Sequence, residues 1–371
     1  MFNPRIIAFY LPQYHPTPDN DKWWGKGFTE WTNVGKAKPL FKGHYQPKVP
    51  ADLGYYDLRL PEVREAQAKL AREAGIEGFC YYHYWFGDGK QELEMPFNEV
   101  VKTGKPDFPF CLCWANESWH SKFWDKDGST YSKKLLIEQK YLGHEDNVKH
   151  FYTLLPAFRD KRYMKYNNKL LFVIYKPLQF ENLKDFISDW RILAKNNGLN
   201  DFYFIGQLQI QKDIPNEIVS SLLENGLDGI NTVRLTSSLV GRPFLKRVQA
   251  RIMANLKNVP RVANYSSVYH KFISSEEIDE NIIPTIIPNW DHSPRSGRNG
   301  LVLHNSTPEL FDRHLKDVFN ILRRKNNQLV FLKSWNEWGE GNYMEPDLKY
   351  GKKYIQVLKD RINTYVNKDT R

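Results

Sequence analysis

Eight short runs of β-branched and aromatic residues, separated by longer helical patterns, constrain the fold of this chain more than any other feature. Each run is almost continuously apolar, which is typical of parallel strands covered by helices. The runs are Arg5–Tyr10, Gly78–Tyr82, Phe110–Ala115, Leu170–Tyr175, Phe202–Gln207, Gly229–Val233, Ile282–Ile287 and Leu329–Lys333. Eight strands that alternate with helices predict an α/β fold, a (β/α)8 TIM barrel with elaborated βα loops.

Three helical patterns between these runs carry start and stop signals. Pro61–Ala74 begins with a first-turn proline and ends before Gly75, and Leu183–Asn197 ends before Gly198. Thr307–Lys325 begins with threonine, a residue that caps helix N-termini. The length of 371 residues would allow two domains, but no Gly/Ser or Pro-rich linker divides the chain. We therefore expect a single barrel domain over the whole chain, 1–371.

The start of the chain and its cysteines bear on where the protein works. No apolar run approaches the roughly 18 residues that cross a bilayer, and no signal-peptide pattern precedes the first strand-like run. The 3 cysteines are odd in number, so a disulfide framework is not expected. These features predict a cytoplasmic protein.

Polar and aromatic residues gather directly after five of the eight runs. Barrel enzymes carry their active sites at the carboxyl ends of the strands, so the barrel fold predicts such a clustering. A single tryptophan is more often a core residue, but repeated aromatics mixed with carboxylates and amides favour a sugar site. The residues are Gln13, Tyr14, His15, His83, Tyr84, Trp85, Trp114, Asn116, Glu117, Trp119, Asn289, Trp290, Asp291, His292, Trp335, Asn336, Glu337, Trp338 and Glu340.

Ser334–Pro346 (SWNEWGEGNYMEP) is the most distinctive segment. Glu337 and Glu340 lie three residues apart after the last run, and Gly339 and Gly341 allow the backbone to turn sharply. Glycosidic cleavage usually needs two carboxyl groups in different protonation states, and a like charge beside aromatic rings separates two pKa values. A solvated turn is the simpler interpretation of two loop glutamates, but it does not explain the tryptophans on both sides of Glu337.

Other motifs are weak. Asp125 and Asp127 have the spacing of a metal–nucleotide-sugar motif, although the adjacent Gly128 and Ser129 mark a surface turn. The sequence has no dinucleotide-binding, P-loop, zinc-protease or paired CxxC pattern. We therefore expect no cofactor and no bound metal.

The excess positive charge of the chain, +10, is not spread evenly, because eight lysines and arginines fall in an interval without acidic residues, Gly229–Ser275. Apolar residues recur there every four positions at Phe244, Val248, Ile252 and Leu256. This pattern predicts a basic amphipathic helix within an insertion near 234–271. An outer barrel helix with a solvated basic face is the simpler interpretation. The alternative is peripheral contact of residues 242–257 with an anionic membrane, such as the inner membrane, or with a lipid-linked glycan. No nucleic-acid-binding module is visible.

Five stretches together resemble a known family. They are Ala8–Val34, Gly54–Phe86, Phe110–Trp119, Pro288–Arg295 and Trp335–Pro346. From about residue 3 to about residue 360 the chain is similar to the WbsX-type proteins of bacterial polysaccharide (O-antigen and capsule) clusters. These are often described as glycosyltransferases but are similar to glycoside hydrolase family 99. That family comprises (β/α)8-barrel endo-α-mannosidases that retain anomeric configuration, so the resemblance implies the same fold.

The resemblance also implies residue roles. Family 99 enzymes carry a Glu-x-x-Glu segment after the last strand, which matches Glu337 and Glu340 here, although Trp338-Gly339 between them differs from the usual pair. Glu337 would act as a base on the sugar's own 2-hydroxyl, giving a 1,2-anhydro intermediate, and Glu340 as general acid and then base. Glu345 matches as well and would complete the site wall. Substrate contacts are expected from Tyr14, Glu30, Trp31, His83, Tyr84, Trp114, Asn116, Glu117, Trp290, Asp291, Trp335 and Asn336.

Three functions remain in competition at this point. The leading hypothesis is a retaining glycoside hydrolase, endo-α-mannosidase-like, that acts on a bacterial surface polysaccharide or its lipid-linked precursor. The first alternative is a glycosyltransferase or transglycosylase, although the sequence offers no nucleotide-binding fingerprint for it. The second is a non-catalytic carbohydrate-binding protein.

Overall fold

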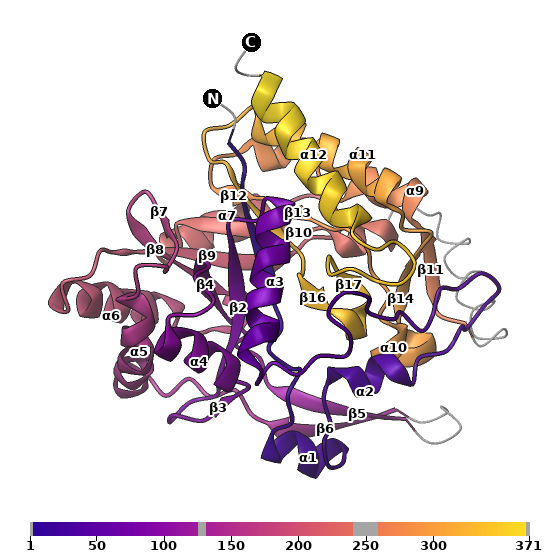
Figure 1. The fold of residues 1–371 in the computed structure, drawn as a ribbon. Coiled ribbons are helices and arrows are strands. Elements are labelled where there is room, and N and C mark those ends of the chain that lie inside the picture. Colours follow the sequence, from indigo (N-terminus) through magenta and orange to yellow (C-terminus); the bar gives the residue numbers. More distant parts are fainter. Residues whose placement is uncertain (1–2, 125–130, 240–258, 369–371) are drawn as a thin grey trace.

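The computed structural model describes residues 3–124, 131–239 and 259–368, and a barrel of parallel strands lies at its centre (Figure 1). The strand order is β12-β10-β9-β8-β4-β2-β1-β15-β13. Their bounds are β1 (Arg5–Tyr10), β2 (Gly78–Trp85), β4 (Phe110–Trp114), β8 (Lys169–Ile174), β9 (Phe202–Gln209), β10 (Gly229–Val233), β12 (Ile282–Ile283), β13 (Thr285–Ile286) and β15 (Leu329–Leu332). Each predicted run contains a barrel strand, so the barrel prediction is confirmed.

The run Ile282–Ile287 closes the barrel as two short strands. β12 pairs with β10 on one side, and β13 pairs with β15 on the other. Pro284 lies between them and has no N–H to donate, so the ladder is interrupted there. Its carbonyl still accepts a hydrogen bond of 3.1 Å from the N–H of Phe331. One predicted strand therefore joins the two ends of the sheet.

Helices cover the outside of the barrel (Figure 1). α3 begins and ends as predicted, since Gly75 has φ 84 and lies in the left-handed region. Thr307 caps α11, because its hydroxyl accepts a 3.3 Å hydrogen bond from the N–H of Leu310. The long helices are α3 (Pro61–Ala74), α4 (Met95–Thr103), α5 (His144–Phe158), α6 (Leu183–Asn196), α7 (Asn216–Glu224), α11 (Pro308–Leu322) and α12 (Lys353–Lys368).

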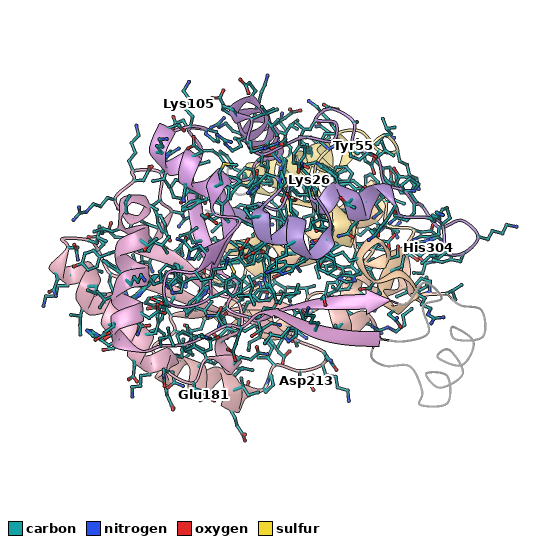
Figure 2. All side chains as sticks on the ribbon, turned by 90° about the horizontal axis from the view of Figure 1, so that it is seen from below. Lys26, Tyr55, Lys105, Glu181, Asp213 and His304 are labelled. Carbon is teal, nitrogen blue, oxygen red and sulfur yellow. The ribbon has the colours of Figure 1, made fainter. Side chains whose placement is uncertain are left out.

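The carboxyl ends of the strands carry the predicted elaborated loops. In Figure 1 these ends point downward, and α1, α2 and the β5–β6 hairpin lie below the barrel; Figure 2 shows the hairpin across this face. The elements of these loops are α1 (Pro18–Trp24), α2 (Glu30–Gly35), β3 (Gln91–Glu92), β5 (Trp119–Trp124), β6 (Tyr131–Ile137), α10 (Ser293–Ser296), β16 (Asn336–Glu337), η6 (Trp338–Glu340) and β17 (Asn342–Tyr343). The remaining short elements are β7 (Lys165–Tyr166), β11 (Arg261–Asn264), α9 (Tyr265–Val268) and β14 (Leu301–His304).

Two predicted features lie outside the described residues: the basic helix over 242–257 and the Asp125/Asp127 pair. Arg234, at the start of the acid-free interval, is described and buried. It pairs with Glu276 and Glu277, just beyond that interval, so its charge is compensated rather than part of a basic face. In the described ranges, no helix is both long enough and apolar enough to cross a membrane.

Many of the aromatic side chains, which make up 15% of the sequence, pack in the core rather than at a site. Trp190 on α6 is fully buried, and its ring packs against those of Phe158, Phe172, Phe186 and Phe202, with centroids 4.6–5.6 Å apart. Aromatic rings at these separations add to the free energy gained by apolar burial. This cluster joins α5 and α6 to the barrel strands.

Trp190→Ala tests this packing. The substitution leaves a large cavity between α6 and the barrel, so we expect the free energy of unfolding to fall by about 3–5 kcal/mol. Ile192→Ala is the matched control on the same helix, because Ile192 is 56% exposed and should change stability by less than about 0.5 kcal/mol. Chemical denaturation measures both; equal losses would contradict the account.

Candidate active site

The segment after β15 is fixed to the barrel before it reaches the two glutamates. The hydroxyl of Ser334 accepts hydrogen bonds from the N–H groups of Asn336 at 3.2 Å and Glu337 at 3.0 Å. The amide side chain of Asn336 bonds to both the N–H and the carbonyl of Leu11, at 2.8 and 3.0 Å. Asn336 is completely buried, so it ties the last strand's exit to that of the first. Glu337 thus has a defined backbone position.

Arg295 on α10 connects three carboxylates from distant parts of the sequence. Its Nε and Nη2 donate to the two oxygens of Glu30, at 2.9 and 3.1 Å. Its Nη1 lies 2.6 Å from Glu340 and 3.5 Å from Glu337. Lys333 contributes a second cation, 3.7 Å from the other oxygen of Glu337. We call these five residues, Glu30, Arg295, Lys333, Glu337 and Glu340, the arginine cluster.

The arginine cluster separates the protonation states of its two loop glutamates. Burial, together with the charge of Glu340, raises the pKa of Glu337 to about 7. Burial opposes ionisation of Glu340, but the charge of Arg295, the hydrogen bond with His292 and the charge of Lys333 together outweigh it and hold the pKa of Glu340 well below its usual range. The glutamate pair therefore holds one proton below about pH 7 and loses it above that pH. This separation agrees with the expectation for an acid–base pair.

One oxygen of Glu337 is left for a ligand. Glu337 Oε2 is buried and has no hydrogen-bond partner among the described residues. Buried carboxylate oxygens are normally hydrogen-bonded, so an unpartnered one in this position suits a ligand hydroxyl. The side chains of Glu337 and Glu340 are only 7% and 14% exposed, which keeps the pair in a weakly polar environment.

Two glycines explain why the glutamates can lie so close to Arg295. A Cβ on Gly339 would stand 1.8 Å from an oxygen of Glu30, so only glycine lets η6 approach this carboxylate. Gly341 has φ +54, and a Cβ there would stand 2.6 Å from the Cβ of Asp291. The sequence-based expectation of a sharp turn is confirmed at Gly341, while Gly339 serves close approach instead.

Aromatic residues support the back of this segment. The hydroxyl of Tyr14 donates to the carbonyl of Asn336 and accepts a 3.1 Å hydrogen bond from the N–H of Trp338. The Trp338 ring stacks on Tyr343 with centroids 3.8 Å apart. Trp31 packs against both Tyr14 and Trp338, at 4.7 and 5.6 Å. The hydroxyl of Tyr14 is therefore committed to holding the loop.

Glu345 and Trp335 also lie behind the loop. Glu345 accepts hydrogen bonds from the Trp338 indole at 2.6 Å, the Gln67 amide at 2.6 Å and the Tyr56 hydroxyl at 2.9 Å. Burial raises the pKa of Glu345 to about 7 despite these donors. Trp335 is fully buried, and its backbone N–H donates a hydrogen bond to the carbonyl of Phe9. The site-wall role of Glu345 stays a prediction.

Three predicted substrate contacts lie together in a different cluster. His83 is 2.8 Å from His150 of α5, nitrogen to nitrogen, and Trp114 packs against the same histidine at 4.9 Å. Asn116 bonds to the backbone N–H and carbonyl of Lys176, at 2.8 and 3.1 Å. All three residues are buried. Because their polar groups contact the protein itself, we do not carry them into the proposed mechanism.

Four other predicted contacts lie closer to the glutamates. Burial, together with the charge of Glu337, raises the pKa of Tyr84. Glu117 lies 3.9 Å from Lys176 at the end of β8. The indole of Trp290 lies below the ammonium of Lys333, 5.5 Å from ring centroid to nitrogen. The N–H of Asp291 donates to the carbonyl of Glu340 at 2.7 Å, while its carboxylate points to the other side of the loop.

Sequence reasoning missed several residues of the site. Arg295 lies within the quoted stretch Pro288–Arg295, but no spacing rule links it to residues 30 and 340. Lys333 carried a usable signal, because a lysine at the end of an apolar strand and four residues before Glu337 is unusual in a core. Tyr82 and Tyr175 were missed as well, whereas His292, which lies 3.4 Å from Glu340, was among the residues expected at the strand ends.

The barrel and the family together define a carbohydrate-active class of protein. The chain belongs to the family described as "Glycosyltransferase WbsX", which matches residues 6–358. An "Uncharacterized protein WxcX" of Xanthomonas campestris pv. campestris is 33% identical over 360 residues, covering 96% of this chain and 49% of that protein. The chain thus spans about half the length of the curated relatives it matches.

Solved structures show the same fold at low sequence identity. A "Glycoside hydrolase-like protein" is 15% identical with a TM-score of 0.61, covering 98% of this chain and 94% of that chain. The GH99 endo-alpha-mannosidase from Bacteroides thetaiotaomicron is 14% identical with a TM-score of 0.57, covering 100% of both chains. The similarity to glycoside hydrolase family 99 inferred from the sequence therefore extends to the fold.

Gly339→Ala tests the close approach in the arginine cluster. The added methyl group must displace the Glu30 carboxylate, so we expect the free energy of unfolding to fall by about 1–3 kcal/mol. The control is Gly35→Ala, where a Cβ would meet nothing within 4 Å. Thermal and chemical denaturation compare the two variants. A Gly339→Ala protein as stable as Gly35→Ala would show that Glu30 does not press against η6.

Proposed function

We propose that this protein is a retaining glycoside hydrolase acting on a bacterial polysaccharide or its lipid-linked precursor, with Glu337 and Glu340 as its catalytic residues. The observation that carries the proposal is the pair of buried glutamates that share one guanidinium nitrogen of Arg295 and whose pKa values are moved apart. A glycosidase needs one protonated carboxyl for the leaving group and one ionised carboxylate for the nucleophile. The family and the fold support this class of chemistry.

The spacing of the two carboxyl groups favours retention. Their Oε1 atoms lie 2.6 and 3.5 Å from the same nitrogen, Nη1 of Arg295, so they are no further apart than the sum of these distances. Inverting glycosidases separate their carboxyl groups by roughly 6.5–9.5 Å to leave room for a water, whereas retaining ones need about 5–5.5 Å. The short separation of these two oxygens therefore supports the retaining arrangement in this proposal.

The proposed reaction proceeds in two steps, following the resemblance to family 99. Glu337 accepts the proton of the sugar's 2-hydroxyl as that oxygen attacks C1, and Glu340 donates its proton to the departing glycosidic oxygen. This gives a 1,2-anhydro sugar and the released chain. Glu340, now ionised, then takes a proton from water as the water attacks C1, and Glu337 returns its proton to the 2-oxygen.

Without substrate the proton of the pair lies on Glu337, whereas the proposed first step needs it on Glu340. Substrate binding would move it. Without substrate, Arg295 favours ionised Glu340, so the proton resides on Glu337. A 2-hydroxyl that donates to Glu337 stabilises its anion, and a glycosidic oxygen that accepts from Glu340 stabilises its acid form. Both contacts move the proton to Glu340 without changing the proton count of the pair.

Glycosyl transfer is the second candidate, because the family itself is described as a glycosyltransferase. The same pair could transfer the 1,2-anhydro intermediate to a sugar hydroxyl instead of water. A nucleotide-sugar transferase would instead bind a nucleoside diphosphate, which calorimetry with manganese present detects. Membrane contact through residues 242–257 remains a separate prediction, which co-sedimentation with anionic liposomes at several salt concentrations measures.

Glu337→Gln and Glu340→Gln test the catalytic assignment. Each removes one ionisable group while keeping the shape, so we expect turnover to fall by at least about 1000-fold with the fold preserved. The matched control is Glu309→Gln at the exposed start of α11, which should keep wild-type turnover. Anomeric NMR during incubation with α-linked manno-oligosaccharides or the host polysaccharide follows the products. Near-wild-type turnover in either pair variant would overturn the assignment.

The raised pKa of Glu337 predicts a pH dependence that can be measured without substrate. The pKa of Glu337 is raised from its ordinary value of 4.5 to about 7, so between these two pH values the folded protein keeps this carboxyl protonated while the unfolded chain ionises it. Native protein binds more protons than unfolded protein in that range, so this group lowers stability as pH rises. Wild-type protein should therefore lose about 2–3 kcal/mol relative to Glu337→Gln between pH 4 and 8. Activity should fall as pH rises through about 7, when the pair loses its proton. A pH-independent stability difference would contradict the shift.

A further inference from the structure

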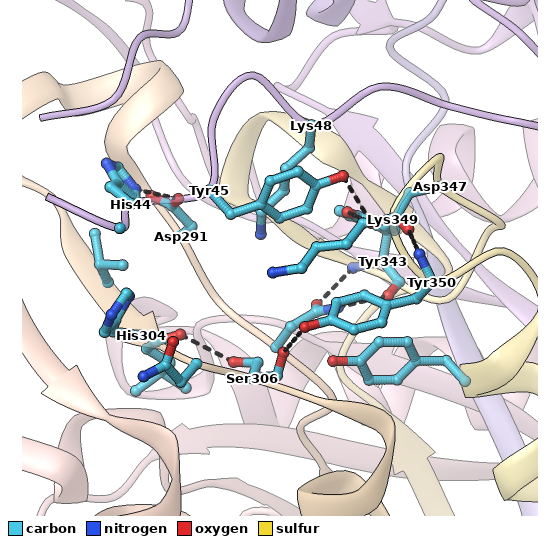
Figure 3. Close-up of a pocket in the computed structure, with 16 residues that line it drawn as sticks. His44, Tyr45, Lys48, Asp291, His304, Ser306, Tyr343, Asp347, Lys349 and Tyr350 are labelled. Atoms are coloured by element: carbon cyan, nitrogen blue, oxygen red, sulfur yellow. Dashed lines mark hydrogen bonds and ion pairs between the residues drawn. The ribbon is translucent and has the colours of Figure 1, made fainter.

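A pocket lies beside the segment that carries the glutamates, and Figure 3 shows the residues that line it. Its walls come from the segment after α2, from β14 and the residues following it, and from the segment after β17. Asp291 and Tyr343 belong to its lining, whereas Glu337, Glu340 and Arg295 do not. The pocket is thus a neighbour of the arginine cluster but distinct from it.

Two lysine ammonium groups line this pocket without an anionic partner. Lys48 is buried, and its Nζ donates to the carbonyl of Gly341 at 3.2 Å. Lys349 is exposed, and its Nζ lies 4.5 Å from the ring centroid of Tyr45 and 4.9 Å from that of Tyr350. Across the described ranges, no carboxylate lies within ion-pair distance of either lysine. Figure 3 shows both side chains directed into the pocket.

The two carboxylates of the pocket are already saturated by other groups. Asp291 accepts from the His44 ring at 2.8 Å and the Gln46 amide at 2.7 Å. His44 accepts at its Nδ1 from the N–H of Leu40, so its Nε2 carries the proton given to Asp291. Asp347 accepts 2.7 Å and 2.6 Å hydrogen bonds from the Tyr343 hydroxyl and the Tyr350 N–H. Both carboxylates lie near enough to raise the pKa of Lys48, although neither forms an ion pair with Lys48 or Lys349.

The like charges weaken each other in the absence of an anion. Burial lowers the pKa of Lys48. The charges of Asp291 and Asp347 raise it in part, and the charge of Lys349 lowers it. His304 lines the same pocket, and burial together with the charge of Lys349 lowers its pKa. An anion between these groups would relieve this repulsion and gain charge-assisted hydrogen bonds.

We propose that this pocket binds an anionic substituent of a glycan, a phosphate or a carboxylate borne by a sugar ring, through Lys349 and Lys48. The rings of Tyr45 and Tyr350 flank Lys349 and offer apolar faces for the sugar that carries the charge. Asn305 and Ser306 add polar groups at the rim. The inference concerns binding and holds whether the glutamate pair hydrolyses or transfers.

The pocket shares two backbone contacts with the catalytic loop. The N–H of Asp291 donates to the carbonyl of Glu340 at 2.7 Å, and Lys48 donates to the carbonyl of Gly341 at 3.2 Å. A charged sugar held here would therefore lie beside the segment that positions Glu340. The pocket would favour acidic glycans over neutral ones for the adjoining site.

Isothermal titration calorimetry at low salt tests the proposal with four probes: glucose 1-phosphate, glucuronate, inorganic phosphate and neutral methyl glucoside. We expect one or both anionic sugars to bind, more tightly than inorganic phosphate, and the neutral sugar not to bind. The phosphate and carboxylate arms identify the anionic group. Lys349→Gln should weaken this binding about tenfold or more. The matched control is Lys352→Gln, which removes the same charge from an exposed lysine paired with Asp52 and Glu73.

Three results would overturn the proposal. They are no binding of either anionic sugar, equal weakening by Lys349→Gln and Lys352→Gln, and binding of inorganic phosphate as tight as that of the sugars. The second would indicate a general effect of net charge. Since neither lysine variant alters the arginine cluster, failure here leaves the proposed catalytic function untouched, and loss of turnover in the glutamate variants leaves this binding site untouched.

Discussion

The contact of Arg295 with three carboxylates is the interaction on which the site depends. A buried guanidinium is costly unless its donors are satisfied, and here Glu30 takes two of them while Glu340 takes a third. The contact also fixes which glutamate is ionised, because Arg295 lies closer to Glu340 than to Glu337. Positioning and protonation therefore have the same cause.

The barrel serves this contact by bringing distant segments to one end. Glu30 begins α2, Arg295 belongs to α10, and Glu340 ends η6, and all three elements follow carboxyl ends of barrel strands (Figure 1). Asn336 fastens the last strand to the first, and Gly339 allows η6 to touch Glu30. The strands supply the frame, while the loops supply every charged group except Lys333. Such a division is typical of barrel enzymes.

The barrel strands and the helix ends could be predicted from the sequence more fully than the contacts between side chains of different loops. Continuous apolar runs revealed the barrel strands, and proline, threonine and glycine marked the ends of α3 and α11 because their effects are local. The pair Glu337 and Glu340 could be found because both lie in one short segment. Arg295 could not, since its partners are far away in sequence. Trp114 shows the converse error: a position after a strand does not reveal whether the side chain faces a ligand or a helix.

The most direct test of the account is a crystal structure with a mannose-configured iminosugar bound. The ring nitrogen of such a ligand is cationic, so the account predicts that it lies beside the glutamate pair. It also predicts that a ligand hydroxyl lies within hydrogen-bond distance of Glu337 Oε2, the buried oxygen without a partner among the described residues. A ligand bound elsewhere on the barrel, with Glu337 and Glu340 untouched at saturating concentration, would contradict the central claim.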